Sequence, residues 1–301
     1  MNVVVFGGSG YLGSHVADAL TDAGHQVSLF DVTPSPYRRP TQKMIVADVL
    51  DPVAVDRALE AAQCAYNFAG IADLDAAAER PIDTVKQNVL GNAILLEAAV
   101  QRQLQRYVYA STVYVYSRAG GFYRCSKQSA ELYIEEYARR YGLGYTILRY
   151  GTVYGPRADG RNSVYRYLHQ ALTTGRIVCQ GTGEEMREYV HVKDAACLSV
   201  QALADEFANT HCLITGPHRM KFAELLEMIR EILDNRVEIH FQPVSDDDVH
   251  YRLTPYSFTP KVAQKLVGTS YLDLGQGLLQ CLADMYEVVG GRERAAGLEA
   301  K

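Results

Sequence analysis

Three features are missing from this sequence: a surplus of basic residues, a long apolar run and an N-terminal secretory signal. Its 301 residues include 30 Lys and Arg against 35 Asp and Glu, giving a net charge of −5, whereas nucleic-acid binding requires a basic surface. No run reaches the ~18–20 apolar residues of a membrane span, and the chain does not begin with a basic region followed by an apolar one. We therefore expect a cytoplasmic protein that binds neither nucleic acid nor membrane.

The sequence also lacks paired cysteine motifs. Its six cysteines, at positions 64, 125, 179, 197, 212 and 281, include no Cys-X-X-Cys pair and have no histidine nearby at ligand spacing. Cysteines scattered in this way are typical of reduced thiols in a cytoplasmic protein. We therefore expect no structural metal.

The most informative segment that is present is a glycine-rich turn near the N-terminus. The apolar run Val3–Phe6 is followed by Gly7, Gly10 and Gly13. This spacing lets the chain turn tightly, lets the backbone approach a pyrophosphate and lets the next helix pack on the strand. A helix over 14–23 would direct its N-terminal amides at that pyrophosphate. Because the spacing also suits an ordinary strand, turn and helix, its context decides between the two interpretations.

The first half of the chain alternates short apolar strands with helices. We expect strands at 3–6, 26–30, 44–47, 65–68, 107–110 and 145–149, and helices at 14–23, 53–62, 81–103 and 126–141. Strands separated by helices form parallel sheets with right-handed crossovers. The predicted fold class is α/β, a Rossmann-type doubly wound parallel sheet, with residues 1–150 as its dinucleotide-binding domain.

The pattern changes after Arg149. Residues 151–160 are rich in Gly and Pro, and the expected elements are then helices at 163–174, 222–233, 259–266 and 272–288 and strands at 188–192 and 211–215. We expect residues 151–301 to form mainly a smaller substrate-binding lobe over the C-terminal edge of the sheet, where ligands bind in such folds. Segments around 188–215 are expected to return to the first domain.

Two acidic residues follow strands at positions suited to a nucleotide. Asp31 ends the second strand about 20 residues beyond the glycines, where a carboxylate accepts both ribose hydroxyls of adenosine and repels a 2′-phosphate. Asp48 follows the third strand and is placed to hydrogen-bond the adenine amine. Arg38 and Arg39, which would favour NADP, lie further along the chain. These positions favour NAD, with a turn-forming Asp as the alternative for Asp31.

A tyrosine and a lysine four residues apart, Tyr123 and Lys127, mark the expected reactive centre. On one face of a helix, the ammonium would lower the pKa of the phenol from about 10 toward working pH and make the phenolate a base. A second such pair, Tyr189 and Lys193, falls in an alternating strand pattern and would not share a face. Thr112 follows the fifth strand and is placed to hydrogen-bond the same substrate oxygen, or else merely ends the strand.

With these features the chain resembles the extended short-chain dehydrogenase/reductases, specifically the NAD-dependent epimerase/dehydratases that act on nucleotide sugars. Besides the glycine turn, the similar segments are Asn67–Gly70, Asn88–Gly91, Ser111–Tyr116, the Tyr123 and Lys127 pair, Leu148–Arg157 and Gly181–Val192. The resemblance covers nearly the whole chain. It implies an enzyme with NAD as cofactor and a nucleotide sugar as substrate.

The resemblance also assigns residues to the site. The catalytic residues are expected to be Thr112, Tyr123 and Lys127. The cofactor is expected to contact Gly7, Gly10, Tyr11, Leu12, Gly13, Asp31, Asp48, Val49, Phe68, Ala69, Gly70, Asn88, Tyr123, Lys127 and Tyr150. The substrate is expected to contact Thr112, Tyr114, Thr152, Arg187 and Arg252. Arginines suit a diphosphate through bidentate contacts, although Arg252 is equally interpretable as a solvated surface residue.

Departures from the family pattern narrow the activity. Sugar 4,6-dehydratases of this family carry Asp-Glu directly after the threonine for water elimination, and Val113 and Tyr114 stand there instead. We therefore expect a 4-epimerase in which Tyr123 takes the C4 hydroxyl proton and a 4-keto sugar forms transiently. Dehydration, net oxidation, C5 epimerisation, uronic-acid decarboxylation and a non-catalytic NAD sensor are the alternatives. Arg118 and Arg124 are candidates for a sugar carboxylate, or ordinary loop arginines.

The sequence also bears on assembly. Helices 81–103 and 126–141 flank the strand before the reactive pair, and the second has more apolar and aromatic surface than one sheet contact requires. Its residues of this kind are Leu132, Tyr133, Tyr137 and Tyr141. Related enzymes commonly pair these two helices across a two-fold axis into a four-helix bundle, so we expect a homodimer. The alternative is that the C-terminal helix covers this surface within one chain.

Overall fold

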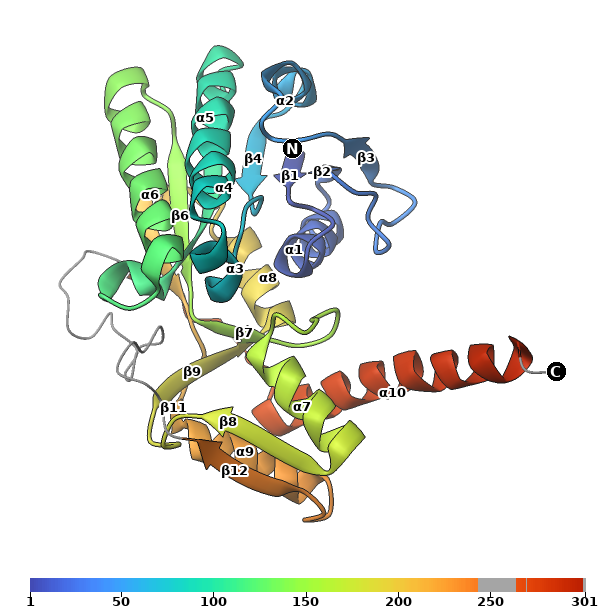
Figure 1. The fold of residues 1–301 in the computed structure, drawn as a ribbon. Helices are drawn as coiled ribbons and strands as arrows, with labels where there is room; N and C mark the ends of the chain where they lie inside the picture. The colour runs from blue at the N-terminus through green and yellow to red at the C-terminus, as the bar shows by residue number, and fades with distance from the viewer. Residues whose placement is uncertain (243–263, 269, 300–301) are drawn as a thin grey trace.

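An eight-stranded parallel sheet forms the centre of the molecule (Figure 1). The computed structural model describes residues 1–242, 264–268 and 270–299. The strand order is β13-β10-β6-β5-β4-β1-β2-β3, and every neighbouring pair is parallel. The strands are β1 (Asn2–Phe6), β2 (Gln26–Asp31), β3 (Lys43–Val46), β4 (Cys64–Asn67), β5 (Arg106–Thr112), β6 (Tyr145–Tyr150), β10 (Thr210–Ile214) and β13 (Gln264–Lys265). The order reverses between β1 and β4, so the predicted doubly wound Rossmann-type fold is confirmed.

Helices cover both faces of this sheet. One face carries α1 (Tyr11–Asp22) and α8 (Val192–Gln201), and the other carries α2 (Pro52–Leu59), α5 (Gly91–Gln101) and α6 (Gly121–Tyr141). Alternate residues of β1 divide between the two layers: Val3 and Val5 belong to the core under α1, whereas Val4 and Phe6 belong to the core under α2 and α5. Because both faces are covered, β1 is apolar at successive positions.

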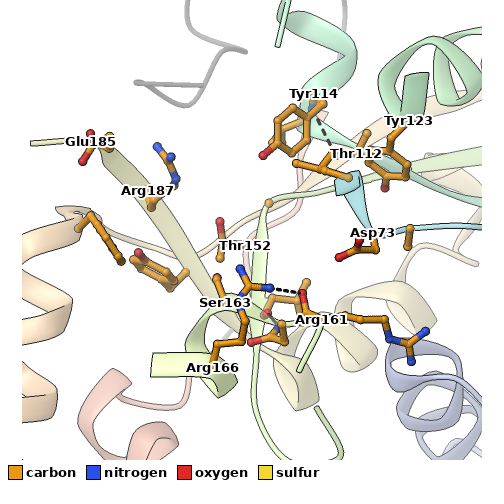
Figure 2. Close-up of a pocket in the computed structure, with 18 of the residues that line it drawn as sticks. Asp73, Thr112, Tyr114, Tyr123, Thr152, Arg161, Ser163, Arg166, Glu185 and Arg187 are labelled. Atoms are coloured by element: carbon orange, nitrogen blue, oxygen red, sulfur yellow. Dashed lines mark hydrogen bonds between the residues drawn. The ribbon is translucent and has the colours of Figure 1, made fainter. Parts of the chain in front are cut away.

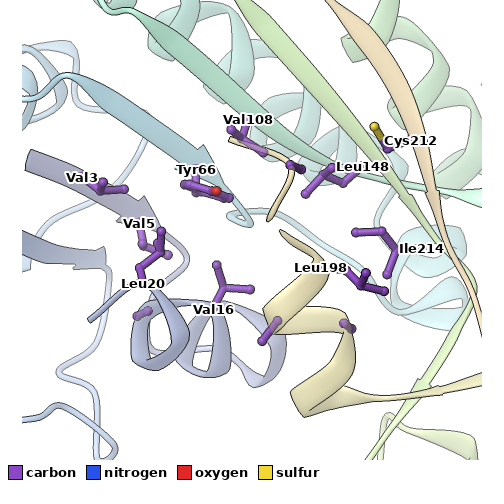
Figure 3. Packing of buried hydrophobic residues seen from close by; sticks show 14 of the residues in the cluster. Val3, Val5, Val16, Leu20, Tyr66, Val108, Leu148, Leu198, Cys212 and Ile214 are labelled. Atoms are coloured by element: carbon purple, nitrogen blue, oxygen red, sulfur yellow. The ribbon is translucent and has the colours of Figure 1, made fainter. Parts of the chain in front are cut away.

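The core between the sheet and the α1–α8 layer is drawn in Figure 3. Val16 and Leu20 of α1 and Leu198 of α8 pack against strand residues such as Leu148. Burial of each such aliphatic side chain contributes about 1.5–3 kcal/mol. The Tyr66 hydroxyl, which is also buried here, donates to the carbonyl oxygen of Ser199 at 2.8 Å. This packing holds the start of α1 at the point where the strand order reverses, which is where the glycine turn lies.

A smaller lobe lies beyond the C-terminal edge of the sheet (Figure 1). It contains the sheet β11-β9-β7 and the parallel pair β12-β8. Its elements are β7 (Thr152–Tyr154), α7 (Ser163–Thr174), β8 (Arg176–Gln180), β9 (Met186–His191), β11 (Arg219–Lys221), α9 (Phe222–Ile232), β12 (Glu238–Gln242) and α10 (Leu274–Glu299). A separate core that includes Leu168, Leu226 and Leu278 holds these elements together.

Two predicted helices differ from the structure. The helix expected at 81–103 is interrupted: α4 (Pro81–Val85) leads into a π-helical turn at Lys86–Leu90 and then into α5. The prediction of a helix at 259–266 is wrong for Gln264 and Lys265, which form β13 and pair with β10. Residues 259–263 lie outside the described residues. Both errors arise because contacts with distant elements outweigh the local apolar pattern.

Other elements were missed or misplaced at the sequence level. The helix α3 (Leu74–Glu79) and the helix α8 were not expected, and α6 begins at Gly121 and not at Ser126. The early start of α6 brings Tyr123 into its first turn. Gly120 and Gly121 have φ values of +93° and +47°. Two adjacent glycines are typical of a loop, so the sequence did not indicate that a helix begins here.

Three further findings concern the class of protein. None of the helices in the described part of the chain is both long enough and apolar enough to cross a membrane. The six cysteines are all unpaired. Within the described residues, His, Cys, Asp and Glu side chains form no group of three that could hold a metal ion.

Candidate active site

The glycine turn connects β1 to α1. Gly7 has a φ of +75°, and a Cβ atom there would lie 2.6 Å from the backbone nitrogen of Ala69. A Cβ atom on Gly13 would lie 2.2 Å from the carbonyl oxygen of Gly7. Gly10 precedes α1 and provides no side-chain cap, which leaves the first N–H groups of this helix available to an anion. The turn therefore fits a pyrophosphate held by backbone amides.

Tyr11 and Leu12 form the start of α1. Leu12 packs against the core under this helix, and the Tyr11 hydroxyl is buried near Tyr154 and Cys281. Their side chains are therefore used in packing. Their predicted cofactor contact rests on the backbone N–H groups at the helix start.

Asp31 ends β2 and is tied to the glycine turn. Its Oδ2 accepts from the backbone N–H of Ser9 at 3.0 Å, and its Oδ1 accepts from that of Thr33 at 3.3 Å. Because a carboxylate can accept about four hydrogen bonds, capacity remains for the two hydroxyls of a ribose. Asp48 follows β3, and its Oδ1 accepts from the backbone N–H of Leu50 at 3.0 Å. Both acids thus have fixed orientations at the sheet edge.

The segment after β4 carries three predicted cofactor residues, Phe68, Ala69 and Gly70. Asn88 of the π-helical turn holds this segment: its Oδ1 accepts from the N–H of Ile71 at 2.7 Å, and its Nδ2 donates to the carbonyl oxygen of Ile71 at 2.9 Å. The second N–H of the same amide group donates to the Ser126 hydroxyl at 2.9 Å. Asn88 therefore orients the segment. Its amide N–H groups would contact the cofactor only if a hydrogen bond to Ile71 or Ser126 were broken.

Two other predicted cofactor residues are buried. Tyr150 ends β6, shares a hydrogen bond of 2.6 Å with the Ser199 hydroxyl and has its ring centroid 6.3 Å from that of Phe68. Val49 is 5% exposed and packs under α5, where a Cβ atom on Gly91 would approach it to 3.0 Å. Both side chains are therefore packed in the interior, next to the segments that follow β3 and β4.

Thr112, Tyr123 and Lys127 come together at the C-terminal end of β5. Thr112 is the last residue of this strand, Tyr123 lies in the first turn of α6 and Lys127 lies one turn further on. The Lys127 Nζ donates to the carbonyl oxygen of Ala110 at 2.7 Å and lies 5.8 Å from the centroid of the Tyr123 ring. The structure thus places the three predicted catalytic side chains in one cluster.

The protonation of this cluster differs from the expectation. Burial raises the pKa of Tyr123 to about 12, and a hydrogen bond with Thr112 offsets part of that rise. Burial lowers the pKa of Lys127 to about 8, against the attraction of Glu131. The prediction that Lys127 brings the phenol toward working pH is therefore wrong for the polypeptide alone. The reason is that desolvation dominates, while the Lys127 ammonium is bonded to a backbone carbonyl.

The competing tyrosine–lysine pair behaves as predicted. Tyr189 is part of β9, whereas Lys193 belongs to α8, so the two side chains do not share a helical face.

A cavity of about 320 Å³ opens in front of Tyr123 (Figure 2). Five predicted residues line it: Thr112, Tyr114, Tyr123, Thr152 and Arg187. The rings of Tyr114 and Tyr123 stand edge to face with their centroids 6.3 Å apart. The fifth residue predicted for the substrate, Arg252, lies outside the described residues, and its role stays a prediction.

Several charged residues that line this cavity were not predicted from the sequence. They are Asp73, Asp75, Arg161, Arg166 and Glu185. Asp73 and Asp75 lie in the segment between β4 and the first turn of α3, so their position beyond a buried strand was an available signal. Arg161 and Arg166 flank the start of α7 and carried no such signal, because the lobe brings them to the sheet edge.

Arg118 and Arg124 are not among the residues that line the cavity. Arg124 instead donates to the carbonyl oxygens of Ser117 at 3.1 Å and Arg118 at 2.8 Å. It therefore stabilises the short loop before α6, which agrees with the interpretation of these residues as loop arginines.

Comparison with known proteins identifies the family. The model of the NAD dependent epimerase/dehydratase family matches residues 3–214. The chain belongs to this family. UDP-glucuronic acid decarboxylase 1 of Arabidopsis thaliana is 26% identical over 330 residues, covering 99% of this chain and 73% of that protein.

Solved structures of family members have the same fold. The UDP-glucose 4-epimerase of Thermotoga maritima, determined with UDP-glucose, is 25% identical and has a TM-score of 0.82, covering 96% of this chain and all of that one (100%). The UDP-glucose 4-epimerase of Thermus thermophilus, determined with NAD, is 25% identical with a TM-score of 0.79, covering 94% and 98% of the two chains. The protein is thus an enzyme of this family with NAD as its cofactor, as predicted.

The fit of the glycine turn to NAD can be tested by substitution. Gly13→Ala should reduce NAD affinity about 10- to 100-fold, because the added carbon overlaps the Gly7 carbonyl oxygen and such overpacking costs about 1–3 kcal/mol. Gly160→Ala is the control, since a Cβ atom there meets nothing within 4 Å. The measurement is NAD retained after gel filtration together with calorimetric titration. Equal retention by both variants would contradict the placement of the pyrophosphate.

Proposed function

We propose that the protein is a nucleotide-sugar 4-epimerase. The observation that supports this most is the cavity wall after β5, where Thr112 and Tyr123 are joined by Val113 and Tyr114. An acid and a base at those two positions would serve elimination of water, and neither apolar Val113 nor the phenol of Tyr114 replaces such a pair. The site is therefore equipped to oxidise and reduce a sugar carbon without breaking a second bond.

In the proposed reaction, Tyr123 removes the proton from the C4 hydroxyl of the sugar. Bound NAD would accept the hydride from C4 and return it to the keto sugar, and in its oxidised form it would supply a positive charge that favours the phenolate. Thr112 orients the sugar hydroxyl, and Lys127, whose Nζ lies 5.8 Å from the centroid of the Tyr123 ring, would hold the ribose of the cofactor. The keto sugar then turns over in the cavity, and Tyr123 returns the proton when the opposite face is reduced.

We assign the binding of the diphosphate to residues of the lobe. Arg187 of β9 lies across the cavity from Thr112 and Tyr123 (Figure 2) and is proposed to bind the diphosphate with Arg252. Thr152, at the start of β7, is placed to contact the sugar. Guanidinium groups suit this task because their planar donors match phosphate oxygens.

The main alternative is decarboxylation of a uronic acid, because the Arabidopsis relative bears that activity in its name. The experiment that separates the candidates is incubation with a panel of nucleotide sugars, followed by mass spectrometry and NMR. An unchanged mass with inversion at C4 supports the epimerase, loss of water or carbon dioxide would replace it with a lyase, and absence of turnover would support a sensor. We also expect NAD to remain bound through purification, since it is regenerated in each cycle.

We further propose that the protein is a homodimer formed through α4, α5 and α6. Apolar side chains are exposed on the helices of this surface: Ile82 (67%), Val85 (53%), Leu132 (64%), Tyr133 (50%) and Tyr141 (52%). In the described residues the C-terminal helix does not cover this surface. α10 packs against α7, α9 and β9 and lies away from α6 (Figure 1). A second copy that buries the same face would form an isologous four-helix bundle.

Charged substitutions on this face should weaken the dimer. Light scattering at micromolar concentration is expected to give twice the chain mass of 33.4 kDa, and the pair Leu132→Glu and Tyr133→Glu should shift it toward one chain. Tyr137 is less suitable for substitution than Leu132 and Tyr133, since its hydroxyl donates to Glu97 at 3.0 Å. Leu279→Glu, on α10, is the control because Leu279 is 46% exposed on another surface. A monomeric wild type would contradict the proposal.

The cytoplasm is the proposed location. Support comes from the six unpaired cysteines, since thiols are kept reduced in that compartment.

A further inference from the structure

The wall of the cavity beside Tyr123 carries acidic side chains. Its reacting end is built by the segments that follow the neighbouring strands β4, β5 and β6, around Tyr123. The charged side chains that these segments contribute are Asp73 and Asp75, and among the described residues they contribute no lysine or arginine to the lining. The group that reacts at Tyr123 is therefore bordered by negative charge.

The lobe contributes charges of both signs to the lining: Glu185 lies on the same side of the cavity as Arg187, and Arg161 lies on the side of Asp73 (Figure 2). Arg161, Arg166 and Arg187 all come from the lobe. Arg166 donates to the carbonyl oxygens of Gly160 and Arg161, each at 3.2 Å. Figure 2 shows Arg187 across the cavity from Thr112 and Tyr123, whereas Asp73 lies on their side. Arg166 and Arg187 therefore suit an anionic diphosphate, whereas the acidic wall beside Tyr123 suits an uncharged sugar.

The lobe arginine that interacts electrostatically with Asp73 is Arg161, and it already forms an ion pair. Arg161 is within electrostatic range of Asp73, but its Nη2 forms an ion pair of 2.5 Å with Asp159. A sugar carboxylate would have to compete with Asp159 for this guanidinium while facing Asp73. Arg161 therefore does not convert the reacting end into a carboxylate site.

Asp73 has capacity left for a sugar hydroxyl. It caps α3, with its Oδ1 accepting from the backbone N–H of Ala76 at 2.8 Å. The cap fixes the carboxylate in the cavity wall, and carboxylate oxygens have lone pairs for further donors. A hydroxyl can donate to such an oxygen, whereas a second carboxylate can only repel it.

On this basis, and resting on the proposed function, we propose that Asp73 and Asp75 select an uncharged hexose and reject uronic acids. The substrate class is then a nucleoside diphosphate linked to a neutral sugar whose hydroxyls donate to Asp73. This distinguishes the chain from its relative that decarboxylates UDP-glucuronic acid, because that reaction needs the C6 carboxylate at the reacting end.

The test compares UDP, UDP-glucose and UDP-glucuronic acid on the NAD-loaded enzyme. Calorimetry gives the affinities, and NMR of the products gives the turnover. Asp73→Asn together with Asp75→Asn removes both charges, and Asn retains the helix cap. Glu79→Gln is the matched control, since it removes one charge from the same helix at a residue that does not line the cavity. Asp75→Asn alone is the second variant, which leaves the cap untouched.

Wild-type enzyme is expected to bind UDP-glucose at least about tenfold more tightly than UDP-glucuronic acid, as like-charge contacts cost several kcal/mol. The double variant should lower the ratio of the two affinities about tenfold without a change in UDP affinity. Asp75→Asn should lower this ratio by a smaller factor, and Glu79→Gln should leave it unchanged. The proposal is overturned if wild-type enzyme binds UDP-glucuronic acid as tightly as UDP-glucose, or if the double variant has the same affinity ratio as wild type. If neither sugar turns over, the epimerase assignment fails while the affinities still decide the selectivity.

Discussion

Tyr123→Phe is expected to lower turnover by about 10²–10⁴-fold, the range for loss of a general acid–base group, with NAD still bound. The hydroxyl that is removed faces the cavity beside Thr112, whereas the Lys127 ammonium keeps its bond to the Ala110 carbonyl. The variant should therefore lose the proton transfer and keep the cofactor site. The measurements are kcat with the substrate found in the panel and the NAD content of the purified protein.

The matched control for this substitution is Tyr133→Phe. Tyr133 lies on the same helix, α6, is 50% exposed and does not line the cavity, so its hydroxyl should not affect turnover. Near-normal activity of Tyr123→Phe would remove Tyr123 from the reaction. Loss of NAD in this variant would show that the ring positions the cofactor as well.

The ionisation of Tyr123 should depend on the cofactor. Burial raises the pKa of Tyr123 to about 12 and lowers that of Lys127 to about 8, so the lysine is charged below about pH 8 and the free phenol stays neutral well above it. In ultraviolet difference titrations of wild type against Tyr123→Phe, Tyr123 should ionise at lower pH with NAD bound, because the oxidised nicotinamide is positive. An identical midpoint without NAD would contradict the electrostatic role given to the cofactor.

The Rossmann-type sheet was predictable because its signals are local and agree with one another. The glycine turn, the apolar strand before it and Asp31 each rest on a few adjacent residues, and the order of strands and helices then fixes a parallel sheet. β13 was not predictable in this way. Its two residues are strand because they pair with β10, and nothing in their own sequence requires that partner.

The site was only partly predictable for the same reason. Thr112 and Tyr123 follow a strand and begin a helix, so the fold places them at the sheet edge. Arg161 and Arg166 reach the cavity through the lobe, whose position over the edge depends on packing between distant segments. The pKa of Tyr123 was predicted in the wrong direction because a four-residue spacing indicates proximity to Lys127 but not burial, which is the larger effect.

Behind the reactive residues lies a buried ion pair that was not foreseen from the sequence. Arg149 of β6 donates to Glu131 of α6 through Nε at 3.0 Å and Nη2 at 2.7 Å, with side-chain exposures of 3% and 4%. The Ser111 hydroxyl donates to the same carboxylate at 2.5 Å, and Arg149 also donates to the Tyr116 hydroxyl at 2.6 Å. Since Ser111 precedes Thr112 and Glu131 lies one turn beyond Lys127, the pair connects the two elements that carry the proposed catalytic residues.

Removing one partner should cost about 3–5 kcal/mol of unfolding free energy, because the other charge is left buried and unpaired. Arg149→Met is therefore expected to lower the urea midpoint strongly, and Arg149→Met with Glu131→Leu should recover much of the loss, since an apolar pair of similar volume is tolerated. Glu136→Gln is the control: its ion pair with Arg139 lies on the same helix but is exposed, and such pairs contribute about 0–1 kcal/mol. A double variant that regains stability but not turnover would show that the pair positions Thr112 and Lys127. Equal costs for Arg149→Met and Glu136→Gln would instead mean that burial adds nothing to the Arg149 pair.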